Sequence, residues 1–510
     1  ALATQTLGRL VRRLPRVAVL HSGLTDTERA WTWEQIRDGH AAVVVGPRSA
    51  AFAPARRLGL IVVDEEHEGS YKQDTAPRYH GRDVAIKRGQ LADAPVLLGS
   101  ATPALETLHN VQAGRYERIR LPRRVRGLPM PRLEIVPLRD ELAMTTPGPR
   151  RIELIGPTLT RKIAAALDRS EQVILLMNRR GFASYVFSPA SGWLMMCPEC
   201  SRPMVYHRAT NLAHCHYCEH TDEVPERCPV SGQKLVLFGF GIQRIESELG
   251  RKFPAAAVAR MDSDTMTSPR QFQEVLGRFA DGRIDILLGT QMVGKGLDFP
   301  RVSLVGVVSA DTALAVPDFR AAERTFQLIV QVAGRAGRGG TAGDVVVQTL
   351  HPDEPAIQRA IRHDYDGFAA HELPLRRQVH LPPYSRIVRF VLRHARPEKA
   401  QATAERLAER LRVIFGIEPP DAAGPTGSAT AGPPGGRGTP AGPAAGNAGG
   451  SAGPVGVALV GPQEASIARV RGQHRFEVRL ITERASVVQD ALAGRMEWLL
   501  RHLSADVLAD

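Results

Sequence analysis

The stretch Gly59–His67, GLIVVDEEH, predicts the fold of the first hundred residues. Its apolar run is typical of a buried strand. The residues that follow at the carboxyl end of that strand are Asp64, Glu65, Glu66 and His67. Open parallel sheets place their ligand sites at this end of the strands. Two carboxylates there can hold Mg²⁺ and orient water, as hydrolysis of a nucleoside triphosphate requires. Taken alone, a charged turn is the alternative.

Similar apolar runs lie on both sides of this stretch. From residue 17 to about 110 they alternate with polar, helix-compatible segments, which indicates a parallel α/β layout. A second series begins at residue 172 with QVILLMN and resumes, after a cysteine-rich segment, with IDILLGT, VSLVGVV and DVVVQTL. The sequence therefore predicts an α/β protein with two similar lobes, the second of them split by an insertion.

The predicted boundaries divide the chain into five parts. They are lobe 1 at 1–120, a connecting segment at 121–165, lobe 2 at 166–183 and 236–370, a zinc-binding insertion at 184–235, and a small C-terminal α/β domain at 371–510. Within the last part, segment 418–454 consists mainly of Gly, Ala and Pro. It cannot bury enough apolar surface to order itself, so we predict a disordered linker or loop there.

Composition limits the classes of protein that this chain can represent. With 510 residues and 43% hydrophobic residues, it is long enough for three or four domains with buried cores. It has no run of eighteen apolar residues and no signal-peptide pattern, so we expect a cytoplasmic protein without a membrane partner. The formal charge of +13 favours a polyanionic partner, although an Arg-rich composition also arises in a GC-rich genome.

All five cysteines fall within one short segment. Four of them form a Cys-x₂-Cys-x₁₄-Cys-x₂-Cys pattern made by Cys197, Cys200, Cys215 and Cys218. Two such pairs suit a tetrahedral Zn²⁺ held by thiolates. Nearby histidines that offer alternative ligands are His207, His214, His216 and His220, but two complete pairs do not need them. The fifth cysteine is Cys228, a doubtful ligand.

Three more motifs carry chemistry. Gly99–Pro103, GSATP, ends a second apolar strand, and its hydroxyl residues Ser100 and Thr102 can link the carboxylate site to a neighbouring lobe. The third strand end is GTQMVGKG at residues 289–296. In QVAGRAGR, residues 331–338, a helix would place Arg335 and Arg338 on one face. Paired arginines suit a transferring phosphoryl group, with a solvated helix end as the alternative.

In this order the four motifs resemble motifs II, III, V and VI of superfamily 2 helicases. Finer features narrow the resemblance: LHSGL at 20–24, SYKQ at 70–73, SATPALETL at 100–108, NRRGFA at 178–183, the inserted cysteines, DFRAAERTFQL at 318–328 and LPPYSR at 381–386. Together they are similar to the PriA family of DNA helicases, from about residue 17 to 400 and weakly beyond.

The resemblance implies a replication restart function. Family members recognise stalled or abandoned forks, unwind DNA with 3′ to 5′ polarity using ATP, and promote primosome assembly in the bacterial nucleoid. The implied partners are forked and single-stranded DNA, primosome proteins and the single-stranded DNA-binding protein. The implied nucleotide-site residues are Asp64 for Mg²⁺, Glu65 for the attacking water, Arg335 and Arg338 for the phosphates, and Glu66, His67 and Gln331 in support.

A polar stretch at residues 70–83 mixes aromatic and basic side chains, as a loop that stacks on bases and touches phosphates does. Its candidate DNA contacts are Tyr71, Lys72, Arg78, Tyr79 and His80. The resemblance makes it the aromatic-rich loop that couples DNA to the ATP site, with a basic surface loop as the alternative. Pro77 stands where relatives usually have Trp, which puts strong coupling in doubt.

Two departures from the family pattern stand out. The chain has no G-x-x-x-x-G-K-[ST] motif, since Gly296 replaces the hydroxyl residue in its nearest string. We therefore expect an N-terminally truncated helicase that is inactive alone; a non-catalytic zinc-bearing DNA-binding scaffold is the alternative. The family also carries a second zinc site, but three of its four ligand positions here are Ser188, Ser191 and Ser231. Serine hydroxyls bind zinc poorly, so we predict one Zn²⁺.

Overall fold

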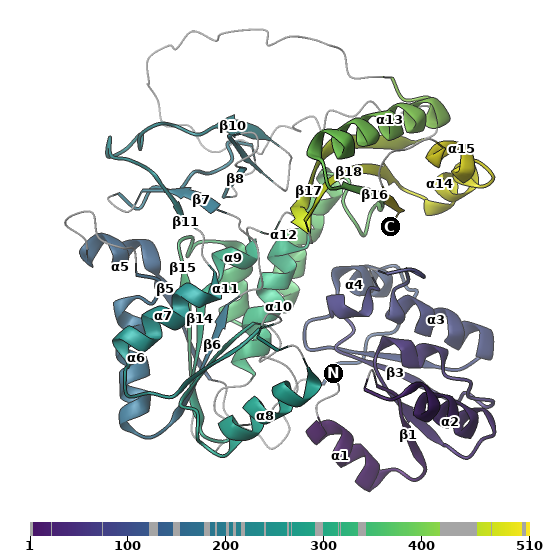
Figure 1. Cartoon of the computed structure of the whole chain (residues 1–510), viewed down its shortest axis with the longest axis horizontal. Coiled ribbons are helices and arrows are strands. Elements are labelled where there is room, and N and C mark those ends of the chain that lie inside the picture. Colours follow the sequence, from purple (N-terminus) through teal and green to yellow (C-terminus); the bar gives the residue numbers. More distant parts are fainter. Residues whose placement is uncertain are drawn as a thin grey trace.

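The chain folds into two α/β lobes, an inserted antiparallel sheet and a terminal α/β domain (Figure 1). In this computed structural model the described residues are 4–21, 23–73, 75–121, 131–145, 153–177, 184–188, 191–199, 203–207, 211–215, 220–238, 241–262, 265–266, 268–290, 299–314, 316, 318–334, 343–418, 456–470, 472–501 and 506–509.

Lobe 1 contains two pairs of parallel strands and the helices around them. Its elements are α1 Thr4–Arg13, β1 Val17–Val19, α2 Asp26–Arg37, β2 Val43–Val45, η1 Arg48–Phe52, β3 Ile61–Asp64, η2 Gly69–Tyr71, α3 Gly81–Ala92, β4 Val96–Gly99 and α4 Leu105–Gln112. Helix α2 begins with a capping box in which Thr25 and Glu28 satisfy each other's backbone N–H groups.

The strands of lobe 1 are parallel, as predicted, but they form two separate sheets. Strand β1 pairs with β2 and β3 pairs with β4, and no ladder joins the two pairs among the described residues. The cross-strand partners Val62 and Leu97 are 58% and 48% exposed. Parallel sheets are normally buried on both faces, so this apolar face of β3 and β4 lacks a cover in the described part of the chain.

Lobe 2 is built on six parallel strands in the order β12-β13-β6-β14-β15-β5. The strands are β5 Arg132–Pro137, β6 Gln172–Met177, β12 Val258–Met261, β13 Ile286–Gly289, β14 Val302–Ser309 and β15 Asp344–Thr349. The helices are α5 Leu138–Thr145, α6 Pro157–Asp168, α7 Ile242–Lys252, α8 Pro269–Ala280, α9 Asp311–Leu314, α10 Ala321–Ala333 and α11 Pro355–Ile361. All six residues of β6 are buried, because apolar clusters cover both faces of the sheet.

The predicted connecting segment at 121–165 contains elements of lobe 2. Strand β5 is the edge strand beside β15, and α6 packs on β6 and β14. The sequence prediction was wrong here for a physical reason. An edge strand is only partly buried, so RLEIVP lacks the continuous apolar run that marks the central strands.

The insertion is a five-stranded antiparallel sheet in the order β10-β9-β8-β7-β11. Its strands are β7 Ser184–Phe187, β8 Val205–His207, β9 Leu212–His214, β10 Thr221–Glu223 and β11 Val236–Phe238. The first and last strands, β7 and β11, pair with each other, so the chain leaves lobe 2 and returns to it at neighbouring positions.

The terminal domain has a four-stranded antiparallel sheet, β17-β18-β16-β19, on which helix α13 packs. Its elements are β16 Arg386–His394, α13 Pro397–Phe415, β17 Val457–Val470, β18 Gln473–Thr482, α14 Ala485–Leu492, α15 Met496–Leu500 and β19 Asp506–Ala509. Helix α12, Tyr365–Gln378, runs across the predicted boundary at residue 371. Apart from Glu418, the predicted disordered segment 418–454 lies outside the described residues.

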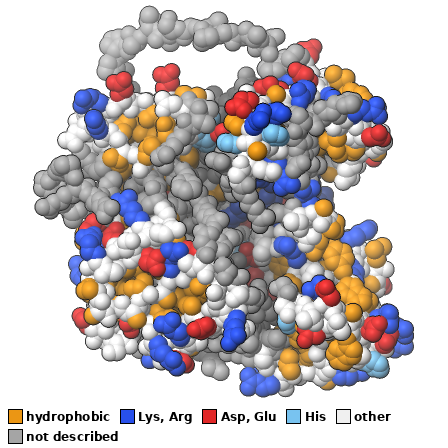
Figure 2. All heavy atoms as spheres, in the orientation of Figure 1, with side chains coloured by type: hydrophobic (Ala, Val, Ile, Leu, Met, Phe, Trp, Pro, Cys, Tyr) orange, Lys and Arg blue, Asp and Glu red, His pale blue; other side chains and the backbone are white. Residues whose placement is uncertain are grey.

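Within the described ranges, no helix combines the length and the apolar character that crossing a bilayer requires. Figure 2 shows basic side chains where the terminal domain approaches lobe 1, so part of the +13 charge gathers at this junction.

Candidate active site

The two strand-end motifs of lobe 1 meet at one sheet edge. The register of β3 and β4 places Asp64 directly beside Gly99. Asp64 is exposed, and its Oδ1 accepts a hydrogen bond of 3.0 Å from the backbone N–H of Glu65. Glu65 has a φ of 47°, in the left-handed region. Such a conformation costs free energy for a residue with a side chain and is often found at functional sites.

Glu66 lies inside lobe 1, although the sequence analysis placed it in support of the ATP site. Its side chain is 1% exposed. Its carboxylate accepts hydrogen bonds from Arg82 at 2.8 Å, from the backbone N–H of Ala104 at 2.7 Å and from Thr107 at 2.9 Å. Glu66 therefore holds helices α3 and α4 against the end of β3, and it can act on the site only by positioning it.

We expect Glu66→Gln to lower the free energy of unfolding of lobe 1 by about 2 kcal/mol, because Arg82 loses its buried carboxylate partner and keeps only the exposed Asp83, and because a buried acceptor becomes a donor. Glu65→Gln is the matched control, since that side chain is 42% exposed, and it should change stability by less than about 0.5 kcal/mol. Urea unfolding followed by tryptophan fluorescence measures both, because Trp31 and Trp33 lie in α2. Equal effects of the two substitutions would contradict the anchoring role of Glu66.

A second contact joins the two motifs directly. His67 Nδ1 and Ser100 Oγ are 2.7 Å apart, and Ser100 Oγ also accepts from the backbone N–H of Thr102 at 3.0 Å. The Glu66 backbone N–H donates to the Gly99 carbonyl at 3.0 Å. Ser100 thus links the two motifs within lobe 1. Thr102, the other hydroxyl residue of GSATP, is buried. A shift of the carboxylate turn must move the GSATP loop with it.

The connection to lobe 2 is made by residues that sequence reasoning did not assign. Glu323 on α10 accepts from the backbone N–H of Leu105, at the start of α4, at 3.0 Å. Its other oxygen pairs with Arg376 on α12 at 2.8 Å, and the side chains of Glu323 and Arg376 are 4% and 0% exposed. The Tyr365 hydroxyl donates to the Pro103 carbonyl at 2.8 Å. We call Glu323, Arg376 and Tyr365 the inter-lobe bridge.

The charges around this bridge are strongly coupled. Burial alone raises the pKa of Glu106, but Arg320 and Arg376 outweigh burial and hold that pKa low, at about 2. Glu106 therefore remains ionised and pairs with Arg320 at 2.5 Å. Burial raises the pKa of Glu323, against the attraction of Arg376. Glu323, a charged residue in the otherwise largely apolar helix α10, is the sequence signal for this contact. The sequence does not show that its partner is Arg376.

The predicted DNA-binding loop is fastened to lobe 1. The Tyr71 hydroxyl donates to the Asp64 carbonyl at 2.7 Å, and burial, with Asp64 nearby, raises the pKa of Tyr71 to about 12. Arg48 donates at 2.8 Å to the carbonyls of both Ser70 and Lys72. The Tyr79 ring meets Phe52 edge-on at 5.0 Å. The loop therefore contacts the strand end that carries Asp64.

The candidate DNA contacts of this loop differ in charge. Tyr71, Lys72, Arg78, Tyr79 and His80 are all partly buried. Burial, together with the positive charge of Arg82, lowers the pKa of His80 to about 4. His80 is therefore neutral at physiological pH, so any phosphate attraction in this loop comes from Lys72 and Arg78.

Most of the motif residues predicted in lobe 2 lie outside the described part of the chain. Arg335, Arg338 and residues 291–298 lie outside the described residues, as does NRRGFA at 178–183. Gln331 is described and lies half-buried in the last turn of α10, the helix that carries Glu323 near its start. The phosphate-contacting role of Arg335 and Arg338 stays a prediction.

The described cysteines of the CxxC pairs come together. Cys197 and Cys215 are 1% and 2% exposed and belong to one core cluster of the insertion, which fits the donor set of a thiolate zinc site. Their predicted partners Cys200 and Cys218 lie outside the described residues. The inner site therefore remains a candidate for one Zn²⁺.

The four positions of the second family zinc site also converge. Ser191 Oγ lies 3.3 Å from Cys228 Sγ, the Ser231 backbone N–H donates to Cys228 Sγ at 3.4 Å, and Ser188 Oγ lies 3.3 Å from Ser231 Oγ. A single thiol among three hydroxyls does not fit a structural zinc ion. Hydrogen bonds hold this cluster together, and the count of one Zn²⁺ per chain stays a prediction.

Comparisons with known proteins connect these features. A family model described as the helicase conserved C-terminal domain matches residues 220–340, and one described as the PriA DNA helicase Cys-rich region matches residues 197–222. The chain is 44% identical over 404 residues to the replication restart protein PriA of Bacillus subtilis. The matched region covers 79% of this chain and 50% of that protein.

Two further relatives show the same pattern. Replication restart protein PriA of Haemophilus influenzae is 40% identical over 386 residues, covering 75% of this chain and 52% of that protein. Its counterpart from Synechocystis is 42% identical over 383 residues, covering 73% and 46%. The chain spans about half the length of the curated relatives it matches. The predicted fold class, two RecA-like helicase lobes with an inserted zinc module, is confirmed.

Proposed function

Because the chain belongs to the PriA family of replication restart proteins, we propose that it forms part of an ATP-dependent DNA helicase motor acting at stalled or abandoned replication forks. The observation that carries this proposal is the series of hydrogen bonds from Glu66 and His67, next to Asp64 and Glu65 in the chain, through the GSATP motif and Ala104 to the start of α4 and Glu323 in lobe 2. A motor needs such a path, because hydrolysis at one lobe must change the position of the other.

In this proposal the strand-end carboxylates serve the nucleotide. Asp64 would hold Mg²⁺, and Glu65 would orient the attacking water. When bound with ATP, Mg²⁺ neutralises phosphate charge. Arg335 and Arg338, which follow α10, would approach the phosphates from lobe 2, with His67 and Gln331 in support. Glu323 of α10 accepts a hydrogen bond from the backbone N–H of Leu105, the first residue of α4. Movement of α10 toward the nucleotide would therefore also move the GSATP loop that precedes α4.

The loop at residues 70–80 would couple DNA to this site. Its Tyr71 donates a hydrogen bond to the backbone of Asp64, so strand binding at Lys72, Arg78 or Tyr79 can shift the carboxylate turn. From the family we further infer 3′ to 5′ unwinding, primosome assembly, and contacts with primosome proteins and the single-stranded DNA-binding protein in the bacterial nucleoid. Cys197, Cys200, Cys215 and Cys218 would hold the single Zn²⁺.

We expect the purified 510-residue chain to bind single-stranded DNA but not to hydrolyse ATP, because its sequence has no G-x-x-x-x-G-K-[ST] motif to hold the phosphates. Phosphate release in the presence of DNA measures hydrolysis, and Asp64→Asn sets the background. DNA-stimulated release above that background would contradict the expectation, and absence of DNA binding would count against the proposed function.

A chimera separates the motor from the non-catalytic scaffold. The part of the Bacillus subtilis relative that this chain does not match, joined to this chain, should give DNA-stimulated ATP hydrolysis, and Asp64→Asn in the chimera should abolish it. A folded chimera that binds ATP and DNA without hydrolysis would support the scaffold.

A further inference from the structure

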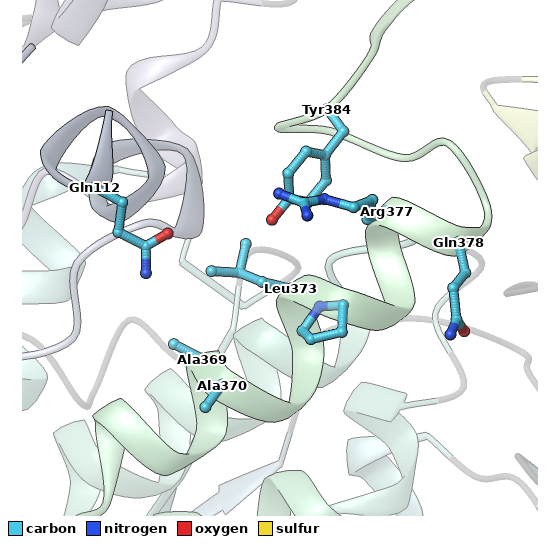
Figure 3. Close-up of a pocket in the computed structure, with 8 residues that line it drawn as sticks. Gln112, Ala369, Ala370, Leu373, Arg377, Gln378 and Tyr384 are labelled. Atoms are coloured by element: carbon cyan, nitrogen blue, oxygen red, sulfur yellow. The ribbon is translucent and has the colours of Figure 1, made fainter. Parts of the chain in front are cut away.

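An open pocket of about 390 Å³ lies where α4 of lobe 1 meets α12 and the turn that follows it (Figure 3). Figure 3 shows Arg377 lying against Tyr384, with Leu373 between them and Gln112, which faces the pocket from α4. The aliphatic side chains of Ala369 and Leu373 line its base, and none of its lining residues is acidic. We call this cavity the Tyr384 pocket.

The polar wall of the Tyr384 pocket is a stacked pair. The Arg377 guanidinium lies 4.5 Å from the centre of the Tyr384 ring, and His109 meets that ring edge-on at 5.1 Å. A guanidinium held on an aromatic ring presents a flat, cationic surface. Arg377 is exposed, whereas its neighbour Arg376 is fully buried in the inter-lobe bridge.

The surroundings of the pocket are positively charged. Arg115 donates to the Asn110 side chain, beside His109, at 3.1 Å, and Arg386 donates to the Pro383 carbonyl, beside Tyr384, at 3.1 Å. Burial lowers the pKa of His109, and Arg115, Arg377 and Arg386 lower it further. Arg115 and Arg386 are exposed. The acidic side chain in the first turn of α12, Asp366, is paired with Arg118 and Arg120. An anionic group entering the pocket therefore meets cations without a competing carboxylate in its lining.

We propose that the Tyr384 pocket binds one nucleotide of single-stranded DNA, a contact separate from the loop at residues 70–80. The base packs on the Arg377 and Tyr384 pair and on Leu373, the Gln112 amide bonds to the edge of the base, and Arg115 or Arg386 meets a phosphate. Flat stacking surfaces with nearby cations bind single strands without strict sequence preference, and glutamine amides suit base edges.

This inference rests on the proposed function, because it assumes a DNA-binding protein. It adds that the strand contacts α12, which carries Arg376 of the inter-lobe bridge, as well as lobe 1. A strand seated in the Tyr384 pocket would touch both α4 and α12. Strand binding there can therefore change how the two lobes are positioned.

Fluorescence anisotropy of a labelled oligothymidylate with the 510-residue chain tests the proposal. Tyr384→Ala should weaken binding about tenfold, the usual effect of removing one stacking residue. Arg377→Ala should weaken binding and reduce the slope of log affinity against log salt by about one. Arg377→Lys should restore the slope but not the full affinity, since lysine keeps the charge without the flat surface.

Three controls keep the outcomes distinct. Arg362→Ala removes an exposed arginine beyond the other end of α12 and should leave affinity nearly unchanged. Thermal unfolding by circular dichroism shows whether Tyr384→Ala is folded; if it is not, Arg377→Lys alone decides. Photocrosslinking with a 5-iodouracil oligonucleotide should label the peptide that contains Tyr384.

Each remaining result has one meaning. If the chain binds DNA, and an Arg78→Ala/Tyr79→Ala variant weakens binding while both pocket variants bind as the unchanged chain does, the inference fails and the proposed function stands. If the chain does not bind DNA at all, both fail. An acidic, aromatic peptide that binds in an Arg377-dependent way, in place of oligothymidylate, would overturn the assignment to DNA.

Discussion

Replacing Arg376 with methionine is expected to lower the free energy of unfolding by about 3 to 5 kcal/mol, the usual cost of leaving a buried charge without its partner. The Arg376 side chain is fully buried and pairs with Glu323 at 2.8 Å and with Glu372 at 3.2 Å. Methionine fills a similar volume but removes the cation that both buried carboxylates share. One of them, Glu323, also holds the first turn of α4.

The adjacent arginine provides a matched control. Arg377→Met makes the same chemical change one residue along α12, at an exposed position, and should alter stability by less than about 0.5 kcal/mol. Urea unfolding measures the free energy, and hydrogen exchange at the α4 backbone shows whether the inter-lobe bridge has opened. Loss of protection in α4 should accompany Arg376→Met. Similar stability of the two variants would mean that the bridge contributes little.

Loss of the zinc ion is expected to have the second large effect on folding. The purified chain should contain one Zn²⁺, and Cys197→Ser should contain none, with the insertion at 184–235 losing its fold. The reason is that structural zinc contributes on the order of 10 kcal/mol to the folding of small modules. Cys197 and Cys215 both lie in the core of this insertion, so loss of the metal would leave buried thiols in a sheet of short strands.

Cys228→Ser is the control, because Cys228 lies among three serines at the second family site. This variant should keep one Zn²⁺. Elemental analysis gives the stoichiometry, and hydrogen exchange across β7 to β11 reports the fold. Two zinc ions in the unchanged chain, or loss of zinc in Cys228→Ser, would show that the serine cluster binds metal after all.

The features that depend on local sequence patterns could be predicted from the sequence. A continuous apolar run predicts a parallel strand, so GLIVV and QVILLM were recognisable. All of β6 is buried, whereas Val63 is the buried residue of β3. CxxC spacing likewise placed two cysteines in one core. These signals are local because the geometry that produces them repeats within a few residues.

Other features depend on partners far apart in the chain. Nothing near Glu323 in the sequence indicates that Arg376 neutralises it or that it bonds to Leu105. For the same reason DEEH gives no sign that its third residue, Glu66, points into the core toward Thr107. The edge strand β5 was missed because its half-buried residues alternate weakly.

The pairing of β7 with β11 has a consequence for how this protein could have evolved. Because Phe187 lies opposite Val236, the two ends of the insertion are separated only by the width of a strand pair. A short turn could replace everything between them without disturbing the six-stranded sheet of lobe 2. The insertion could therefore be gained, lost or altered without changing lobe 2, and the cluster formed by Ser188, Ser191, Cys228 and Ser231 lies wholly within it.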